Sequence, residues 1–401
     1  MADTRPIRRV VTGVDERGRS KVLWDGPAPN ARGMEPGAPP NLTDIWVWQA
    51  SPLPLAGERD DGNIPYDFPG PENGGHVRII RSSGRAAGYD PKKDPAAVPF
   101  HEPKLRPPGR TWDRGGRNAY TTDMHKTATV DYAVMLEGER KLVLDDGEIT
   151  VGVGDVVIQV GAWHQWSRPQ DNSTMLYDMI AAQFVDGPAG LGQGSDKVLR
   201  ADPKVLRADP TVLRADSARK LPPGVRPARR VVSIDREPGR SCLVEDGPSP
   251  DVLLDPARPG FASARLWVTD GTPARIVFES LHLPRRLEPP PKGSVLSVVT
   301  LPPDDSWRGK VGSAQVQAYF QAAGSPAAST YSAQSPHPYM QKTRTLDIVM
   351  MLEGELVLVL DTQEVGLRQG DIVVQRGTNH AWSNRSGKSA VIAIASHDGT
   401  Y

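Results

Sequence analysis

A histidine beside a tryptophan occurs at two equivalent places in the chain. His164 lies in the run WHQW, and His380 lies in the run HAW, 216 residues later. The same shift relates Asp131 to Asp347, so each copy contains one imidazole and one carboxylate. Imidazole exchanges protons near neutral pH and is also the commonest metal ligand in proteins. Both chemistries are open here, and so is a third interpretation in which buried hydrogen bonds satisfy these side chains.

These residues belong to a long internal repeat. Residues 124–168 align with residues 340–384 without a gap, and 23 of the 45 positions are identical. Residues 5–29 return as residues 226–250, at a shift of 221. A solenoid or propeller unit repeats every ~20–50 residues, so this much longer period indicates a duplicated whole domain.

The repeat divides the chain into two domains and a linker. We expect one domain in residues 1–195 and the other in residues 223–401. Between them, residues 196–222 contain VLRAD three times at a spacing of seven. Pro203 and Pro210 interrupt these heptads, and proline disrupts helix interiors, so we expect short turns outside both domains instead of a coiled coil.

The repeated unit has the pattern of β-strands. Apolar residues alternate over residues 140–144, and Asp-Gly and Gly-Asp turns separate that segment from residues 148–153 and 156–160. Gly and Pro number 39 each, which suits an all-β protein with many turns. Trp46 and Trp267 recur at equivalent places and are predicted to anchor the core.

Two long irregular segments interrupt the strands. Residues 82–123 and 302–339 are polar or rich in proline, although VQAYF lies in the second segment. Loops of this length in a compact domain are usually functional, so these segments are candidates for lids.

The composition excludes several classes of function. Lys plus Arg and Asp plus Glu number 48 each, so there is no bulk charge to attract nucleic acid or an anionic membrane. Cys242 is the single cysteine and is predicted to be a packing residue. No apolar run is long enough for a membrane span, and no secretory signal is apparent, so we expect a cytoplasmic protein.

The spacing of the repeated residues resembles the two motifs of the cupin superfamily. The first motif is matched by His125, Thr127, Asp131 and Gly138, and the second by Gly154, Gln159, Gly161 and His164. The corresponding second-half residues are Gln341, Thr343, Asp347, Gly354, Gly370, Gln375, Gly377 and His380. The resemblance implies an all-β fold with two cupin-type jelly-roll β-barrels in tandem. Thr127 stands where the family has histidine, Asp131 where it has glutamate, and Gln159 where it has proline.

The resemblance also implies a metal site in the first half. His125, Asp131 and His164 correspond to family ligands and would form a 2-His-1-carboxylate set for Fe, Mn, Zn or Ni. Asp131 and His164 are then the catalytic candidates.

A substrate pocket would surround this metal site. It would be formed by Thr127, Gln159 and Trp166. The second half has Gln341 in place of a ligand, so no metal is expected there. Its equivalent residues are Gln341, Asp347, Gln375, His380 and Trp382.

The predicted function is small-molecule chemistry with the first-half metal as a Lewis acid. The resemblance leaves dioxygenase, lyase, isomerase and decarboxylase activities open. The alternatives are a metal-free enzyme that uses His164 with Asp131 for acid–base catalysis, or a binding protein without turnover. We expect a small-molecule substrate, no nucleic-acid or membrane partner, and exposed edge strands that permit a homodimer.

Two further groups of residues receive structural interpretations. Lys126 and Lys342 recur and are expected on a solvated strand face; the alternative is that they point inward and bind a carboxylate. Four histidines have no partner in the other repeat and are expected in surface or loop positions. They are His101, His282, His337 and His397.

Overall fold

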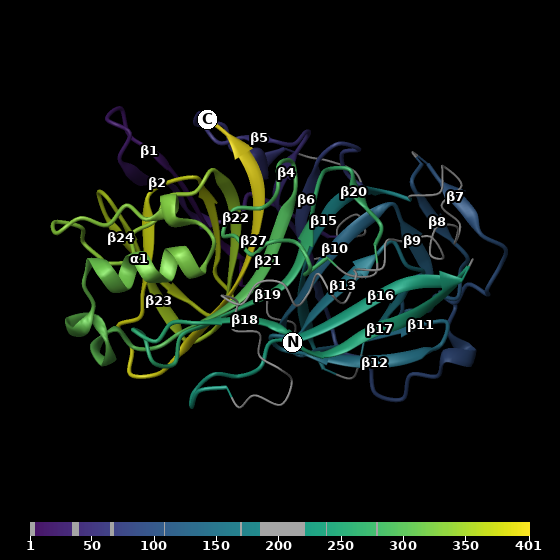
Figure 1. Cartoon of the computed structure of the whole chain (residues 1–401). Coiled ribbons are helices and arrows are strands. Elements are labelled where there is room, and N and C mark those ends of the chain that lie inside the picture. The colour runs from purple at the N-terminus through teal and green to yellow at the C-terminus, as the bar shows by residue number, and fades with distance from the viewer. Residues whose placement is uncertain are drawn as a thin grey trace.

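The structure is a computed structural model (Figure 1). It describes residues 5–33, 40–64, 68–107, 109–168, 171–184, 221–237, 239–277 and 280–401. Apart from its last two residues, the predicted linker at 196–222 lies outside the described residues.

Two long sheets form the centre of the molecule. The first long sheet runs in the order β17 (Arg240–Pro248), β16 (Arg229–Glu237), β13 (Val156–Val160), β10 (Thr129–Glu137), β15 (Ser173–Gln183), β6 (Gly75–Ser82), β4 (Leu42–Trp48) and β3 (Asn30–Arg32), with β20 (Ala274–Arg275) beside β15. The second long sheet runs in the order β18 (Asp251–Leu254), β19 (Ala262–Thr269), β21 (Ser294–Leu301), β27 (Ala390–Thr400), β22 (Thr345–Glu353), β25 (Ile372–Arg376), β1 (Arg8–Val14) and β2 (Ser20–Pro27), with β5 (Leu53–Pro54) beside β27.

Three-stranded sheets complete the two halves. One contains β12 (Gly147–Gly152), β11 (Glu139–Leu144) and β14 (Gln165–Ser167), and its second-half counterpart contains β24 (Glu364–Arg368), β23 (Glu355–Leu360) and β26 (His380–Ser383). A third contains β7 (Lys104–Arg106), β8 (Thr111–Asp113) and β9 (His125–Thr127). The helix α1 (Ser313–Ala322) lies beside the second half (Figure 1). Single-turn 3-10 helices occur at Asp61–Asn63, Pro91–Lys93, Asp304–Ser306, Arg308–Lys310 and Pro326–Ala328.

The two long sheets have equivalent strand orders, but their first hairpins are exchanged. The hairpin β1–β2 comes from the first repeat, yet β1 pairs in parallel with β25, where Val10 lies opposite Val373. The hairpin β16–β17 comes from the second repeat, yet β16 pairs with β13, where Val232 lies opposite Ile158. Each half of the fold therefore contains one hairpin from the other repeat. Domain boundaries at residues 195 and 223 stay a prediction that follows the sequence repeat.

Strand alternation divides most apolar side chains of the sheets among three large cores. Val130 and Val134 of β10 belong to a large core with residues of both long sheets, among them Ile348 of β22. Ala133 belongs to a separate core with β11 and Trp166, inside the first half. Val349 belongs to the matching core inside the second half. The first of these cores joins the two halves, and the other two lie between each long sheet and its three-stranded partner.

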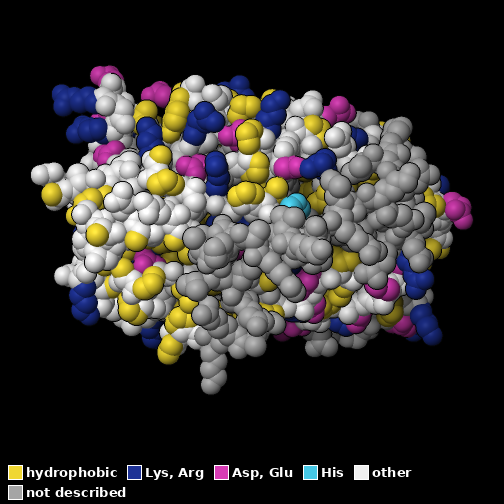
Figure 2. Space-filling model, viewed as in Figure 1, with side chains coloured by type: hydrophobic (Ala, Val, Ile, Leu, Met, Phe, Trp, Pro, Cys, Tyr) yellow, Lys and Arg dark blue, Asp and Glu magenta, His cyan; other side chains and the backbone are white. Residues whose placement is uncertain are grey.

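The described residues confirm the all-β fold class and the two tryptophan anchors. Trp46 and Trp267 are almost completely buried in the shared core. Cys242 is buried as well, in β17. Basic and acidic side chains are interspersed over the face in Figure 2. No helix in the described part of the chain has the length and apolar character needed to cross a membrane.

Candidate functional site

A buried carboxylate and a buried amide face the interior of each half. In the first half Asp131 of β10 lies opposite Gln159 of β13, and in the second half Asp347 of β22 lies opposite Gln375 of β25. Their strand neighbours, such as Val130, point into the shared core, so period-two alternation turns these four side chains the other way. Asp131 and Asp347 thus occupy equivalent positions in the strand pairing of the two halves, as predicted.

Burial perturbs both carboxylates strongly. Removal from water raises the pKa of Asp131 to about 7 and the pKa of Asp347 to about 6. Oδ1 of each aspartate, both amide atoms of Gln159 and Oε1 of Gln375 are buried without a hydrogen-bond partner among the described residues. Because buried polar groups are normally paired, these atoms mark positions where a ligand or water would bind. A carboxylate with a pKa near neutral can also accept and return a proton.

The first half brings two histidines together. The rings of His125 and His164 lie 4.2 Å apart between centroids, and the two backbones form an isolated antiparallel bridge. His125 Nδ1 donates to the carbonyl of Asp123 at 2.8 Å, and His164 Nδ1 donates to the carbonyl of Ala162 at 2.9 Å. Burial lowers the pKa of both histidines, that of His164 by the larger extent, so both rings are neutral at pH 7. Each Nε2 is then a lone-pair donor, which is the tautomer that a metal ligand needs.

The predicted three-ligand set does not assemble around this pair. No group of three His, Cys, Asp or Glu side chains within the described ranges is placed so that it could hold an ion. Two imidazoles whose Nε2 atoms have no partner among the described residues fit a metal ion, but the carboxylate of Asp131 does not join them as a third ligand. His125, Asp131 and His164 as a triad therefore stay a sequence-based prediction that the geometry does not favour.

The second half replaces this arrangement with a direct hydrogen bond. Gln341 lies where the first half has His125, and its backbone forms the same bridge with His380. The Gln341 Nε2 amide donates to His380 Nε2 at 3.3 Å, while His380 Nδ1 donates to the carbonyl of Thr378 at 2.9 Å. Burial lowers the pKa of His380 to about 4, so this ring is also neutral. The lone pair that is available in the first half is occupied here by an amide proton.

A cavity of about 90 Å³ lies in the second half, next to this hydrogen bond. Strands β19, β21, β22 and β27 contribute to its wall. The polar residues that line it are Arg258, Ser263, Arg285, Arg286, Ser297, Gln341, Thr343, Asp347, His380 and Ser396. One water needs roughly 10–15 Å³ of such volume, so the cavity is large enough for a small organic ligand.

The long loop of the second half forms part of the cavity wall. Tyr319 of α1 and Tyr339 line the cavity, and Phe320 on the same helix packs with Tyr339 and Trp307 in a separate apolar cluster. Trp382 also lines the cavity, and its Nε1 is buried with no acceptor among the described residues. The segment predicted as a lid thus contributes side chains to the site.

The predicted first-half pocket residues are buried, but they do not lie at this cavity. Thr127 is buried with its hydroxyl 3.5 Å from that of Thr111. Trp166 packs edge-on against His164, with 6.4 Å between centroids, and against Tyr177. Of the second-half equivalents, Gln341, Asp347, His380 and Trp382 line the cavity.

The sequence did not predict that a carboxylate of the second repeat binds two segments of the first half. Lys126 was expected in solvent but is completely buried, and its Nζ lies 2.5 Å from Asp235 Oδ2. Asp235 Oδ1 also accepts from the backbone N–H of Trp163 at 2.9 Å. Because Lys126 adjoins His125 and Trp163 adjoins His164, one carboxylate of β16 holds both histidine segments. Lys342, by contrast, is exposed as predicted.

His337 lies in a loop, as predicted, but its side chain is buried, whereas His397 lies buried on β27 and not in a surface or loop position. His397 Nε2 lies 2.8 Å from Asp178 Oδ2, and the ring packs 4.4 Å from Trp48 between centroids. His397 follows Ala395 on β27 and shares its face, and Ala395 belongs to the shared core, so this pair joins the two halves. His337 is buried beside Asp304 at 3.5 Å. Nothing in the repeat signals either contact, because neither histidine has a counterpart in the other repeat.

No family model matches the chain. A 53-residue segment is 42% identical to the cupin-domain-containing oxidoreductase virC of Hypocrea virens, covering 13% of this chain and 27% of that protein. A 48-residue segment is 52% identical to the phomopsin biosynthesis cluster protein C' of Diaporthe leptostromiformis, covering 12% of this chain and 25% of that protein. The chain therefore matches about a quarter of the length of these curated relatives. A solved structure, the putative glyoxylate induced protein of Pseudomonas aeruginosa, aligns at a TM-score of 0.35 with 10% identity, over 84% of this chain and 78% of that one.

Proposed function

We propose that the chain is a cupin-type small-molecule enzyme whose substrate binds in the second-half cavity. The observation that carries this proposal is Asp347, a buried carboxylate that lines the cavity and has an unpartnered oxygen. Its pKa is raised to about 6 by burial, so at pH 7 it is ionised yet close to its titration point. A general base is most effective under these conditions.

The residues around Asp347 receive distinct roles in this proposal. Asp347 removes a proton from the bound substrate and returns it later. Trp382 offers its unpartnered Nε1–H to an acceptor atom of the substrate. His380 stays neutral and holds the cavity wall beside Asp347 in place. Its Nδ1–H donates to the Thr378 carbonyl, and its Nε2 accepts from the Gln341 amide.

The duplication supplies a matched control for the test. Purified protein is incubated with a library of small acids, amides and alcohols, and bound and converted compounds are identified by mass spectrometry. Asp347→Asn should lower turnover by roughly 10²–10⁴-fold, the contribution of a positioned general base. Asp131→Asn makes the same change at the equivalent position of the first half and should leave turnover within about twofold. Loss of turnover in Asp131→Asn with full activity in Asp347→Asn would contradict the proposal.

A second candidate site rests on the histidine pair of the first half. Two neutral imidazoles with free Nε2 atoms favour a divalent ion at His125 and His164, and such an ion would act as a Lewis acid. Elemental analysis of protein purified without a chelating tag should find about one ion per chain, and His125→Gln should remove it. Gln341→His should add a weak second site. Metal retained in full by His125→Gln would refute this candidate.

A further inference from the structure

We propose that the ligand of the second-half cavity is a small carboxylic acid with an apolar body, bound with its carboxylate at the arginine end of the cavity. This inference rests on the proposed function, since it names the substrate class of that same site. It follows from the distribution of polar and apolar groups along the cavity wall.

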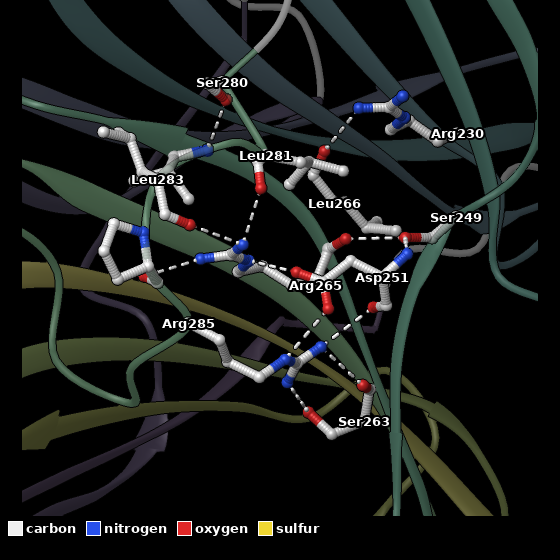
Figure 3. A network of polar contacts seen from close by, with 12 residues as sticks. Arg230, Ser249, Asp251, Ser263, Arg265, Leu266, Ser280, Leu281, Leu283 and Arg285 are labelled. Atoms are coloured by element: carbon white, nitrogen blue, oxygen red, sulfur yellow. Dashed lines mark hydrogen bonds and ion pairs between the residues drawn. The ribbon is translucent and has the colours of Figure 1, made fainter. Parts of the chain in front are cut away.

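One end of the cavity is lined by arginines. Arg285 is almost completely buried and is fixed by Asp251, whose Oδ1 lies 3.0 Å from its Nε, and by the carbonyl of Ser263 (Figure 3). Arg258 is also buried, between the rings of Phe261 and Tyr339, whose centroids lie 3.7 and 3.6 Å from its Cζ.

Two arginines of the cavity wall, Arg258 and Arg286, have donors without a partner among the described residues. Nη2 of Arg258 is buried and has no acceptor among the described residues, although its Nε donates to Asp255 at 2.7 Å. Arg286 lines the same cavity, is exposed, and forms no ion pair with any described carboxylate. Guanidinium groups bind carboxylates through paired, charge-assisted hydrogen bonds, so an anionic oxygen pair is the ligand group that these donors fit best.

The opposite end carries the groups assigned to chemistry. Asp347 lies on β22, whereas Ser263 lies on β19, and β21 and β27 separate the two strands. Three inter-strand steps of ~4.8 Å place the two backbones roughly 14 Å apart. A ligand that spans the cavity therefore keeps its charge at one end and presents a different, proton-bearing group to Asp347.

Mainly apolar side chains, with Ser297 and Ser396 among them, line the stretch between the two ends. Val299, Leu301 and Ile394 come from the sheet, and Tyr319 and Trp382 add aromatic faces. Such a wall favours an apolar or aromatic body over a sugar or a polyol, since a polar body would lose its hydrogen bonds to water on binding.

The test compares carboxylic acids with their neutral amides. The probes are 4-hydroxybenzoate and 3-(4-hydroxyphenyl)propanoate, each with its amide, and binding is measured by calorimetry. At least one acid should bind at least tenfold more tightly than its amide. Arg286→Gln, a change at an exposed position, should weaken the acid at least fivefold and leave the amide unchanged. Arg17→Gln, an exposed arginine in the turn between β1 and β2, is the matched control and should change neither.

Ser297→Phe separates the inference from the proposed function. Ser297 lines the cavity, so a phenyl group there should block every ligand of this site. Amides that bind as tightly as acids, with both blocked by Ser297→Phe, would overturn the carboxylate class but leave the cavity as the site. Acids that bind Arg286→Gln and Ser297→Phe as tightly as they bind the wild type would also overturn it. So would the absence of any acid binding at millimolar concentration. The proposed function is judged separately, from Asp347→Asn against Asp131→Asn.

Discussion

Replacing Lys126 by methionine tests whether the second repeat holds the first-half histidines in place. Lys126 Nζ is fully buried, 2.5 Å from Asp235 Oδ2 and 4.4 Å from the ring centroid of Phe184. Methionine keeps most of the side-chain volume but removes the charge. Asp235 would then be a buried carboxylate whose remaining donor among the described residues is the backbone N–H of Trp163.

The expected loss of stability is large for a single substitution. Removing one partner of a buried ion pair costs about 3–5 kcal/mol, because the other charge stays buried without compensation. Lys342 is the equivalent residue of the second half, and it is exposed with its Nζ 4.9 Å from the ring centroid of Tyr401. Lys342→Met should therefore cost less than about 1 kcal/mol.

The assay is denaturant unfolding of the wild type, both single variants and the double variant Lys126→Met/Asp235→Asn. Asparagine removes the unpaired charge and can still accept from Trp163, so the double variant should recover most of the lost stability. A double-mutant cycle then gives the coupling between the two residues. Equal effects of Lys126→Met and Lys342→Met, or a double variant that is less stable than Lys126→Met, would refute the reasoning.

Three further outcomes are expected. Asp131→Asn and Asp347→Asn should stabilise the protein at pH 8 by on the order of 1–3 kcal/mol and have little effect at pH 4. The reason is that the pKa of each carboxyl is higher in the folded than in the unfolded protein, so the wild type keeps its full stability below the unfolded-state pKa and loses part of it as the pH rises through about 6 to 7. Denaturant unfolding at both pH values measures the difference. His397→Leu should cost about 3 kcal/mol in the same assay, because it leaves the carboxylate of Asp178 buried at the junction of the halves; an unchanged unfolding midpoint would contradict this. Deleting residues 198–204, one copy of the linker repeat, should shift Tm by no more than a few degrees, and loss of folding would show that the segment belongs to a core.

The sequence predicted the local features of the fold because they depend on periodicity. Alternation of apolar residues is visible in residues 140–144, and the duplication assigns Asp131 and Asp347 to the same position. The structure places both on inward faces, opposite Gln159 and Gln375. These relations follow from pleating and register, which the chain encodes over a few residues.

The remaining features depend on contacts between distant segments. The apolar pattern around Val10 is the same whether its strand joins one long sheet or the other, so it cannot reveal the hairpin exchange. Lys126 lies in an ordinary polar–apolar pattern, and only the placement of Asp235, 109 residues away, makes its burial tolerable. The predicted metal triad stays a prediction for a similar reason: spacing assigns Asp131 to the histidine pair, but spacing does not fix the distance between a strand face and a separate bridge.

The exchange of hairpins explains how two similar repeats came to carry different sites. Because β16 of the second repeat lies in the first half, a change in the second repeat alters the surroundings of His125 and His164. Asp235 occupies such a place, and its counterpart in the first repeat is Val14, which is exposed. Correspondingly, Lys126 is buried in an ion pair, whereas Lys342 lies in solvent. Each half thus takes part of its structure from the other repeat. The two sites could therefore diverge, one toward a histidine pair and the other toward a cavity with a carboxylate. The shared core kept the same fold in both halves.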